Sequence, residues 1–330
     1  AASDVYKRQI VLGPLSFQPA EYLKVIVVWY LAHTFSKQQS AIEHYDYQAL
    51  TKNRWIPRTK EEFNDWRYYL LVMIGLVAIQ PDLGNAAIIV LTTVVMFSIS
   101  GVSYRWFTAL FACIVGISSA FLGLIALVGV QAMAKVPIFG YVAKRFAAYF
   151  NPFKDLTGSG LQLSHSYYAM SNGGWFGLGL GNSIEKTGYL PEATTDFVFS
   201  IVIEELGLIG AVLILALLFF LILRVMIVGV KARNPFNSMM ALGVGALMLM
   251  QVFVNIGGIS GLIPSTGVTF PFLSQGGNSL LVTSVGIAFV LNIAANEKRD
   301  NIVQAIEEGL SQTQELENQN EKIVPLRRSR

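Results

Sequence analysis

Four carboxylates stand within one short stretch of this 330-residue chain, GYLPEATTDFVFSIVIEELG, at the beginning of a long apolar run. They are Glu192, Asp196, Glu204 and Glu205. Carboxylates are costly in hydrocarbon, so each needs a structural or chemical reason. Asp196 directly precedes the apolar run, where an acid can cap a helix by accepting backbone N–H bonds. The same side chain could also act as a general base or a metal ligand, and these roles are compatible with capping.

Glu204 and Glu205 lie two turns further into the apolar run. Neighbouring residues of a helix point about 100° apart, so the two side chains face different surroundings. Their candidate partners are Lys186, Gln251 and Asn255, of which the last two share one helix face. We expect these acids to make polar contacts between helices rather than to take part directly in catalysis.

Basic residues gather in the segment before these acids, at Lys144, Arg145, Lys154 and Lys186. A guanidinium group binds phosphate through paired N–H donors, so this set could bind a phosphorylated ligand. The alternative, which the residues alone favour, is a set of charges that face solvent or lipid headgroups.

Two stretches that contain Pro and Gly interrupt the apolar segments: QPDLG (Gln80–Gly84) and GLIPSTGVTFPFLSQGGNS (Gly261–Ser279). Broken backbone at membrane depth is tolerated where it lines a cavity, although both stretches could also be ordinary connectors. Asp82 is the only charged residue of the first stretch. His165 has no second histidine nearby, which favours a hydrogen-bonded structural role over metal binding.

Composition indicates the elements that must position these residues. The chain is 53% hydrophobic and 14% charged, with a mean hydropathy of +0.52, whereas soluble domains carry about a quarter charged residues. An all-α, polytopic membrane helix bundle is therefore expected. Seven apolar runs approach the roughly 20 residues of a spanning helix: 20–35, 69–79, 85–100, 106–129, 197–230, 238–256 and 279–295. The net charge of +3 gives no indication of nucleic-acid binding, and the single cysteine, Cys113, excludes an intrachain disulfide.

The positions of Lys and Arg in short loops predict the topology. They place the loop after the first run and the tail, residues 297–330, in the cytoplasm. Residues 10–296 then form the membrane-embedded domain, in which residues 130–196 are a long external region. Residues 1–9 carry neither an initiator Met nor a signal-peptide pattern and are interpreted as a junction segment. The charged tail, rich in Gln and Asn, either forms a helix or stays disordered.

Five stretches together resemble the SEDS family of cell-wall glycosyltransferases: LGPLSFQPAEYLK, QPDLGNA, YLPEATTDFVFSIVIEELGLIG, VFVNIGGISGLIPSTGV and PFLSQGGNSLL. They occur in the family's order, between residues 12 and 296. The stretch GLGLGNSIEKTGYLPEATTDF is more similar to the members that act in cell division than to those that act in elongation. The resemblance implies ten membrane spans, seven of them in this chain. It also implies polymerisation of lipid II into glycan strands at the outer face of the bacterial cytoplasmic membrane.

The resemblance further implies site residues, partners and a cofactor. The acid of the family's TDF motif corresponds to Asp196, the expected catalytic residue. Substrate binding is expected at Arg145, Gln162, Lys186, Glu192, Ser274, Gly276 and Gly277, and structural polar roles at Asp82, Glu204, Glu205, Gln251 and Asn255. The expected partners are undecaprenyl-linked glycan, a class B penicillin-binding protein and other division proteins. A divalent cation, Mg²⁺ or Mn²⁺, remains open as a cofactor.

The chain also departs from the family pattern at several positions. Gln9 and Ile10 replace an aromatic residue, Leu161 and His165 replace Tyr and Gln, Thr194 replaces His and Gln275 replaces Tyr. Asp196 is retained, so the departures bear on contacts with the substrate rather than on the expected catalytic residue.

In the hypothesised reaction, Asp196 accepts the proton of the acceptor GlcNAc C4 hydroxyl. The oxygen attacks C1 of MurNAc in the growing strand with inversion and expels undecaprenyl pyrophosphate, whose charge Arg145 and Lys186 stabilise. One alternative is a flippase or other transporter, in which buried carboxylates and broken helices are equally natural. A noncatalytic scaffold for division proteins is another alternative.

Overall fold

The computed structural model describes residues 10–12, 15–42, 66–80, 82–100, 137–154 and 159–327, with scattered positions between 112 and 129. The elements are β1 (Ile10–Leu12), β2 (Leu15–Phe17), α2 (Pro19–Ile42), α4 (Trp66–Ile79), α5 (Leu83–Ile99), α8 (Pro137–Phe150), α9 (Ser159–Gly173), the 3-10 turn η2 (Glu185–Thr187), α10 (Val198–Lys231), α11 (Pro235–Ile259) and α12 (Gly277–Arg327). The two strands form a small antiparallel hairpin that pairs Ile10 with Phe17.

The expected membrane helix bundle is confirmed. Helices α10, α11 and α12 are long and apolar enough to cross a membrane, and α4 and α5 contain shorter apolar segments. The β1–β2 hairpin is an addition that the sequence did not predict. The expected span at 106–129 lies almost entirely outside the described residues.

Helix α11 is the centre of the bundle, in contact with α2, α5, α9, α10 and α12. Small residues let its neighbours approach closely. A Cβ on Gly243 would lie 2.6 Å from a methyl carbon of Val28, and one on Gly245 would lie 2.8 Å from Cγ of Met226. Because helices in lipid associate through such close packing, these glycines fix how α2 and α10 sit against α11.

Helix α10 is broken at Gly207, whose φ of 70° and ψ of 179° are not helical. The chain from Gly174 to Gly179 fills the break. Leu178 and Gly179 donate their backbone N–H groups to the carbonyls of Glu204 and Glu205, at 2.9 Å each. On the other side, the N–H groups of Leu208 and Ile209 donate to the carbonyls of Gly174 and Trp175. The backbone groups that the break releases are thereby satisfied.

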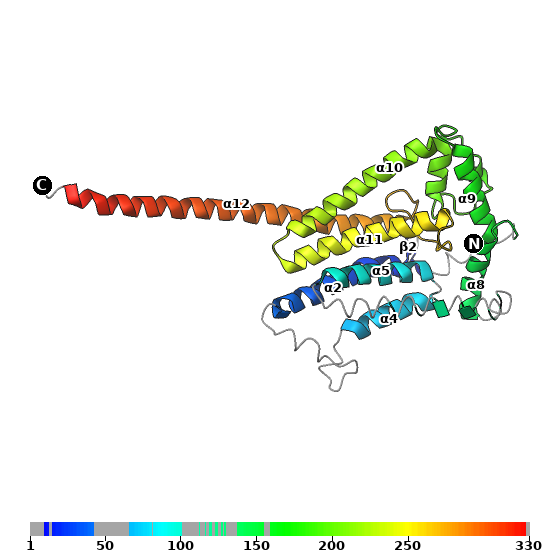
Figure 1. Cartoon of the computed structure of the whole chain (residues 1–330), viewed down its shortest axis with the longest axis horizontal. Helices are drawn as coiled ribbons and strands as arrows, with labels where there is room; N and C mark the ends of the chain where they lie inside the picture. Colours follow the sequence, from blue (N-terminus) through cyan, green and yellow to red (C-terminus); the bar gives the residue numbers. More distant parts are fainter. Residues whose placement is uncertain are drawn as a thin grey trace.

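The break corrects the expectation of one continuous span at 197–230. The exposed apolar residues of α10 begin after Gly207 and extend to Val230, which is long enough to cross a bilayer. The short segment before Gly207 bends toward the end of α11 (Figure 1). Glu204 and Glu205 therefore precede the lipid-facing run instead of lying two turns inside it.

The helices of the region predicted to be external and the tail lie at opposite ends of the bundle. Helices α8 and α9 cross the end at which α5 begins and α11 ends, whereas α12 projects beyond the other end (Figure 1). The tail is helical to Arg327, which decides between the two expectations for it. This arrangement agrees with the predicted topology, in which the two regions lie on different sides of a membrane.

Candidate active site at the end of the bundle

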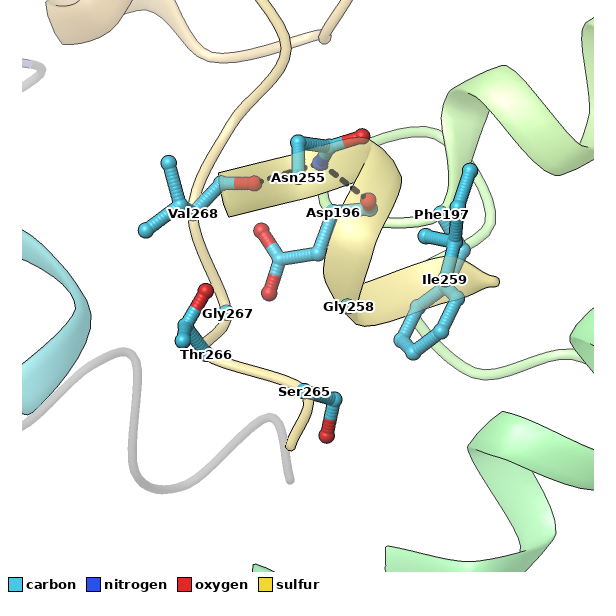
Figure 2. Close-up of a pocket in the computed structure, with 9 residues that line it drawn as sticks. All are labelled: Asp196, Phe197, Asn255, Gly258, Ile259, Ser265, Thr266, Gly267 and Val268. Atoms are coloured by element: carbon cyan, nitrogen blue, oxygen red, sulfur yellow. Dashed lines mark hydrogen bonds between the residues drawn. The ribbon is translucent and has the colours of Figure 1, made fainter. Parts of the chain in front are cut away.

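A small pocket contains Asp196, the residue predicted to be catalytic. Its lining comes from the start of α10, the end of α11 and the extended segment that follows α11: Asp196, Phe197, Asn255, Gly258, Ile259, Ser265, Thr266, Gly267 and Val268. The enclosed space is about 10 Å³, room for roughly one water molecule. Asp196 is partly exposed, and its carboxylate points toward the segment at Gly267 (Figure 2). Any larger ligand must approach this carboxylate from the open side.

The backbone around Asp196 is held by three consecutive hydrogen bonds. Thr194 O accepts from the N–H of Gln275 at 2.8 Å, and Thr195 O accepts from Ser274 Oγ at 2.6 Å. Asn255 Nδ2 donates to Asp196 O and also to Val268 O, at 2.7 Å each (Figure 2). Asn255 and Ser274 are buried. The carboxylate of Asp196 is thus presented by a rigid backbone, as a positioned catalytic group requires.

Arg145 reaches the same place from α8. Its guanidinium donates to Ser265 O. A Cβ built on Gly267 would lie 3.0 Å from Nη2 of Arg145 and 3.2 Å from Oδ2 of Asp196. Both charged groups therefore face one point on Gly267, although they stand about fifty positions apart in the sequence. The expectation that this arginine and this acid belong to one site agrees with the geometry.

The interpretation of Asp196 as a helix N-cap is wrong. The cap position of α10 is Phe197, and its side chain makes no capping hydrogen bond. A turn at residues 192–197, in which Thr195 N and Phe197 N both donate to Glu192 O, carries Asp196 past the helix end. The acid therefore faces the pocket instead of the first turn of α10.

Four polar residues that sequence reasoning left largely unused lie just behind this pocket, at the ends of α2 and α5. Lys24 Nζ is 2.8 Å from Glu21 Oε2, and Asn85 Nδ2 donates to Glu21 at 3.2 Å and to Asp82 at 2.9 Å. All four residues are at least 96% buried. Asp82, predicted to be structural, accepts from the N–H of Asn85 as the N-cap of α5. The stretch FQPAEYLK, which carried the family resemblance, was the available signal for Glu21 and Lys24.

This polar cluster and the Asp196 pocket share one wall. A Cβ on Gly84 would lie 2.6 Å from Thr266 O and 2.8 Å from a methyl carbon of Val268. Gly84 follows Asp82 in the chain, so the 265–268 segment has the cluster on one side and Asp196 with Arg145 on the other. Glycine at 84 is what allows α5 to come this close.

Lys186 lies elsewhere. Its ammonium group pairs with Glu205, and neither residue lines the Asp196 pocket. The expected partnership of Lys186 with this pair of acids is confirmed, whereas the expected partners Gln251 and Asn255 are not found: Asn255 contacts Asp196 and Val268 instead. The predicted role of Lys186 in substrate binding stays a prediction.

Glu204 is a structural anchor, as predicted. It is fully buried and accepts hydrogen bonds from Ser183 Oγ, from Asn172 Nδ2 at 3.3 Å and from Ile184 N at 3.2 Å. His165 also has the expected structural role, since its Nδ1 lies 2.6 Å from Glu185 Oε2. These contacts tie the 182–186 segment to α9 and α10.

The remaining predicted site residues either shape turns or lie away from the Asp196 pocket. Glu192 has a φ of 60° and accepts from Thr195 Oγ1 at 2.9 Å, so it shapes the turn before Asp196. Gly276 and Gly277 form the start of α12. Gln162 is half-buried on α9 and Gln251 is buried within α11; neither lines the pocket.

Tyr167 lies against the turn at the end of α11, where its hydroxyl occupies the space that a Cβ on Gly261 would need. Burial raises the pKa of this phenol, and the neighbouring Tyr149 raises it further. Tyr167 is therefore neutral at physiological pH.

Within the described residues, no group of three or more His, Cys, Asp or Glu side chains could form a metal cage. Asn255 lines the pocket together with Asp196. Its side-chain oxygen Oδ1 is buried and has no hydrogen-bond partner among the described residues. This oxygen points away from the Asp196 carboxylate (Figure 2), so Asp196 is the candidate ligand here. A cation bound to it would take its other ligands from substrate and water, as Mg²⁺ does.

Comparison with known proteins shows the family to which the chain belongs. The model of the cell cycle protein family FtsW/RodA/SpoVE matches residues 4–299. The chain belongs to this family. It is 50% identical over 285 residues to the probable peptidoglycan glycosyltransferase FtsW of Lactococcus lactis, covering 86% of this chain and 67% of the relative. It is 38% identical to the probable peptidoglycan glycosyltransferase FtsW of Bacillus subtilis, covering 86% of this chain and 66% of the relative. It is 37% identical to the stage V sporulation protein E of the same organism, covering 86% of this chain and 70% of the relative. The chain thus spans about two thirds of the length of these curated relatives.

Solved structures of family members have the same fold. A chain of a peptidoglycan synthase complex superposes with a TM-score of 0.61 at 26% identity, covering 88% of this chain and 73% of that one. A variant of the rod shape determining protein RodA of Thermus thermophilus superposes with a TM-score of 0.50 at 25% identity, over 88% of this chain and 70% of that one. Both similarities extend over nearly the whole chain.

Proposed function

We propose that this protein is a peptidoglycan glycosyltransferase that polymerises lipid II into glycan strands during cell division. The observation that carries the proposal is the convergence of Asp196 and Arg145 at Gly267, in a chain whose curated relatives are named as peptidoglycan glycosyltransferases. The 50% identity to a division member supports the division role over elongation.

Asp196 is the general base. It accepts the proton of the acceptor sugar's C4 hydroxyl while that oxygen bonds to C1 of the donor sugar and the C1–O bond to the pyrophosphate breaks. General-base assistance of this kind contributes roughly 10²–10⁴-fold to the rate. The hydrogen bond from Asn255 to Asp196 O fixes the backbone of the base, so little reorganisation is needed at the moment of reaction.

Arg145 is the charge-stabilising group. Its guanidinium is oriented by the Ser265 carbonyl, and the planar fork of an arginine suits the oxygens of a phosphate group. As the donor bond breaks, negative charge moves to the leaving pyrophosphate, and a fixed cation beside it lowers the barrier. Lys186 is left out of this step because it pairs with Glu205.

A divalent cation fits the same place as a further proposal. The Asp196 carboxylate is the chain's candidate ligand. When bound, the cation would supply additional charge compensation for the pyrophosphate. Added chelator would then reduce polymerisation and Mg²⁺ or Mn²⁺ would restore it.

The partner and the orientation in the membrane are also proposals. The synthase complex that contains the structural relative coordinates polymerisation with crosslinking, which supports a class B penicillin-binding protein as the crosslinking partner, with other division proteins. The end of the bundle that carries α8 and α9 faces outward, so that Asp196 works at the outer face of the bacterial cytoplasmic membrane.

One structural feature favours the transporter alternative. The buried Glu21–Lys24 pair with Asp82 and Asn85 is the kind of intramembrane polar cluster that transporters use. An assay in detergent separates the two functions because detergent micelles have no second leaflet to which lipid II could be moved. We expect the full-length protein and its partner to form glycan polymer from lipid II in detergent. Transport of lipid II in vesicles without polymer formation in detergent would replace the enzyme with a flippase.

A further inference from the structure

The loop that fills the break in α10 carries a set of exposed apolar side chains. Trp175 is 66% exposed, Phe176 84% and Leu180 77%, and Leu178 is also exposed. The sequence from Ser166 to Ile184 contains no charged residue. Soluble surfaces rarely place such residues together without a partner.

The backbone of this loop is held in one conformation by glycines and by hydrogen bonds to α10. Gly174, Gly177, Gly179 and Gly181 all have positive φ, and the loop is bonded to both sides of the α10 break. A Cβ on Gly177 would lie 2.2 Å from Glu205 O, so only a glycine allows the loop to approach the α10 backbone this closely. These bonds fix the backbone from which the aromatic side chains project.

The loop also lies where the lipid-facing surface begins. Trp175 O accepts from the N–H of Ile209 at 3.2 Å, and Ile209 is one of the first exposed apolar residues of the run that continues through Leu213 and Leu217. In Figure 1 this bend is at a corner of the molecule, where α9 meets the outer end of α10. On the other side of the loop the surface becomes polar, at the Lys186–Glu205 pair.

We propose that the loop from Trp175 to Leu180, the anchor loop, inserts into the bilayer at the level of the lipid headgroups and upper acyl chains. Trp and other amphipathic or apolar rings concentrate at this depth. The absence of charge in the loop and its continuity with the lipid-facing surface of α10 favour lipid over a protein partner. The anchor loop thereby fixes how deep the bend of α10, and with it the start of that helix near Asp196, sits relative to the membrane surface.

Spin labelling of the full-length protein in liposomes of phosphatidylethanolamine and phosphatidylglycerol tests this proposal. Cys113, the single cysteine of this chain, is replaced by Ala together with any other cysteine, and nitroxides are attached at Phe176→Cys or Leu180→Cys. Leu217→Cys provides the lipid reference, and Thr187→Cys, exposed on η2, provides the aqueous reference. Power saturation then compares accessibility to O₂, which partitions into lipid, with accessibility to a water-soluble nickel chelate.

We expect the ratio of O₂ to nickel accessibility at positions 176 and 180 to shift from the value at 187 toward the value at 217. Two results would overturn the proposal. The first is a ratio at both positions equal to that of Thr187→Cys in the bilayer. The second is accessibility to nickel that is high for the protein alone and lost when the partner synthase is added, which would make the loop a protein interface.

Discussion

At the scale of single residues, Gly267 determines how Asp196 and Arg145 meet. Its φ of 72° and the absence of a side chain leave a gap that both charged groups border. A methyl group there would press against Nη2 and Oδ2 at once, and the groups can relieve it only by moving apart. The proposed chemistry needs Asp196 at the acceptor hydroxyl and Arg145 at the leaving pyrophosphate of the same reaction, so the packing at this one position affects catalysis.

Replacing Gly267 with Ala tests this coupling. We expect polymerisation of lipid II to fall, but by less than the roughly 10²-fold that a displacement of 1 Å costs, because the two groups need to move by only a fraction of that distance. The matched control is Gly181→Ala, because Gly181 has a φ of 87° and open space where the Cβ would be. Both variants carry the backbone strain of about 1–2 kcal/mol that left-handed conformations cost. Equal activities of the two variants would show that the gap at Gly267 has no role.

At the scale of elements, the break in α10 and the loop inserted in it form one unit. Glu204 receives hydrogen bonds from the 182–186 segment, and Gly173 at the end of α9 lies directly against the α10 backbone. These contacts connect α9, the loop and the first segment of α10, which leads back to Asp196. The unit is what holds the start of α10 in a fixed position.

The two neighbouring acids of α10 should differ sharply in their effects on stability. Glu204→Gln places an amide N–H₂ where Ser183 and backbone N–H groups now donate, and unmet buried donors cost about 1–3 kcal/mol. Glu205→Gln removes a partly exposed pair with Lys186, worth about 0–1 kcal/mol. Melting of the purified variants in detergent should therefore rank Glu204→Gln well below Glu205→Gln. The reverse order would contradict the assignment of Glu204 as the anchor.

The contact between α9 and α10 can be tested separately. A Cβ on Gly173 would lie 2.0 Å from Ile203 O, so Gly173→Ala forces the helices apart at a cost of about 1–3 kcal/mol. Gly309→Ala is the control, since Gly309 lies on the exposed part of α12 with open space around it. There alanine should be neutral or should stabilise the helix by up to about 1 kcal/mol. An unchanged melting temperature for Gly173→Ala would mean that α9 is not held as described.

At the scale of the whole molecule, a helix bundle holds the site at one end and the tail helix at the other. Composition and apolar runs predicted this bundle because they depend only on which residues avoid water. The break at Gly207 was not predictable in the same way, since a single glycine in an apolar run does not reveal that a distant loop will fill it. Asp196 and Arg145 were proposed through the family resemblance, and the structure brings them together at Gly267. The substrate-binding role of Lys186 stays a prediction, because Lys186 pairs with Glu205 and does not line the pocket.

The predicted topology requires Thr187 and Gln312 to lie on opposite sides of the membrane. In spheroplasts that express single-cysteine variants, a membrane-impermeant maleimide should label Thr187→Cys, and Gln312→Cys only after the membrane is permeabilised. Both positions are exposed in the structure, so burial does not account for a difference. Labelling of Gln312→Cys in intact spheroplasts would place the tail outside and Asp196 inside.

The most direct test of the central claim, that Asp196 is the catalytic base, is the rate of glycan polymerisation by an Asp196→Asn variant. The full-length variant is assayed with its partner synthase and lipid II in detergent, beside Glu192→Gln as the neighbouring control. We predict a rate reduced by about 10²–10⁴-fold with lipid II binding and partner binding retained, and a much smaller loss for Glu192→Gln. An Asp196→Asn variant that polymerises lipid II at the wild-type rate would contradict the claim.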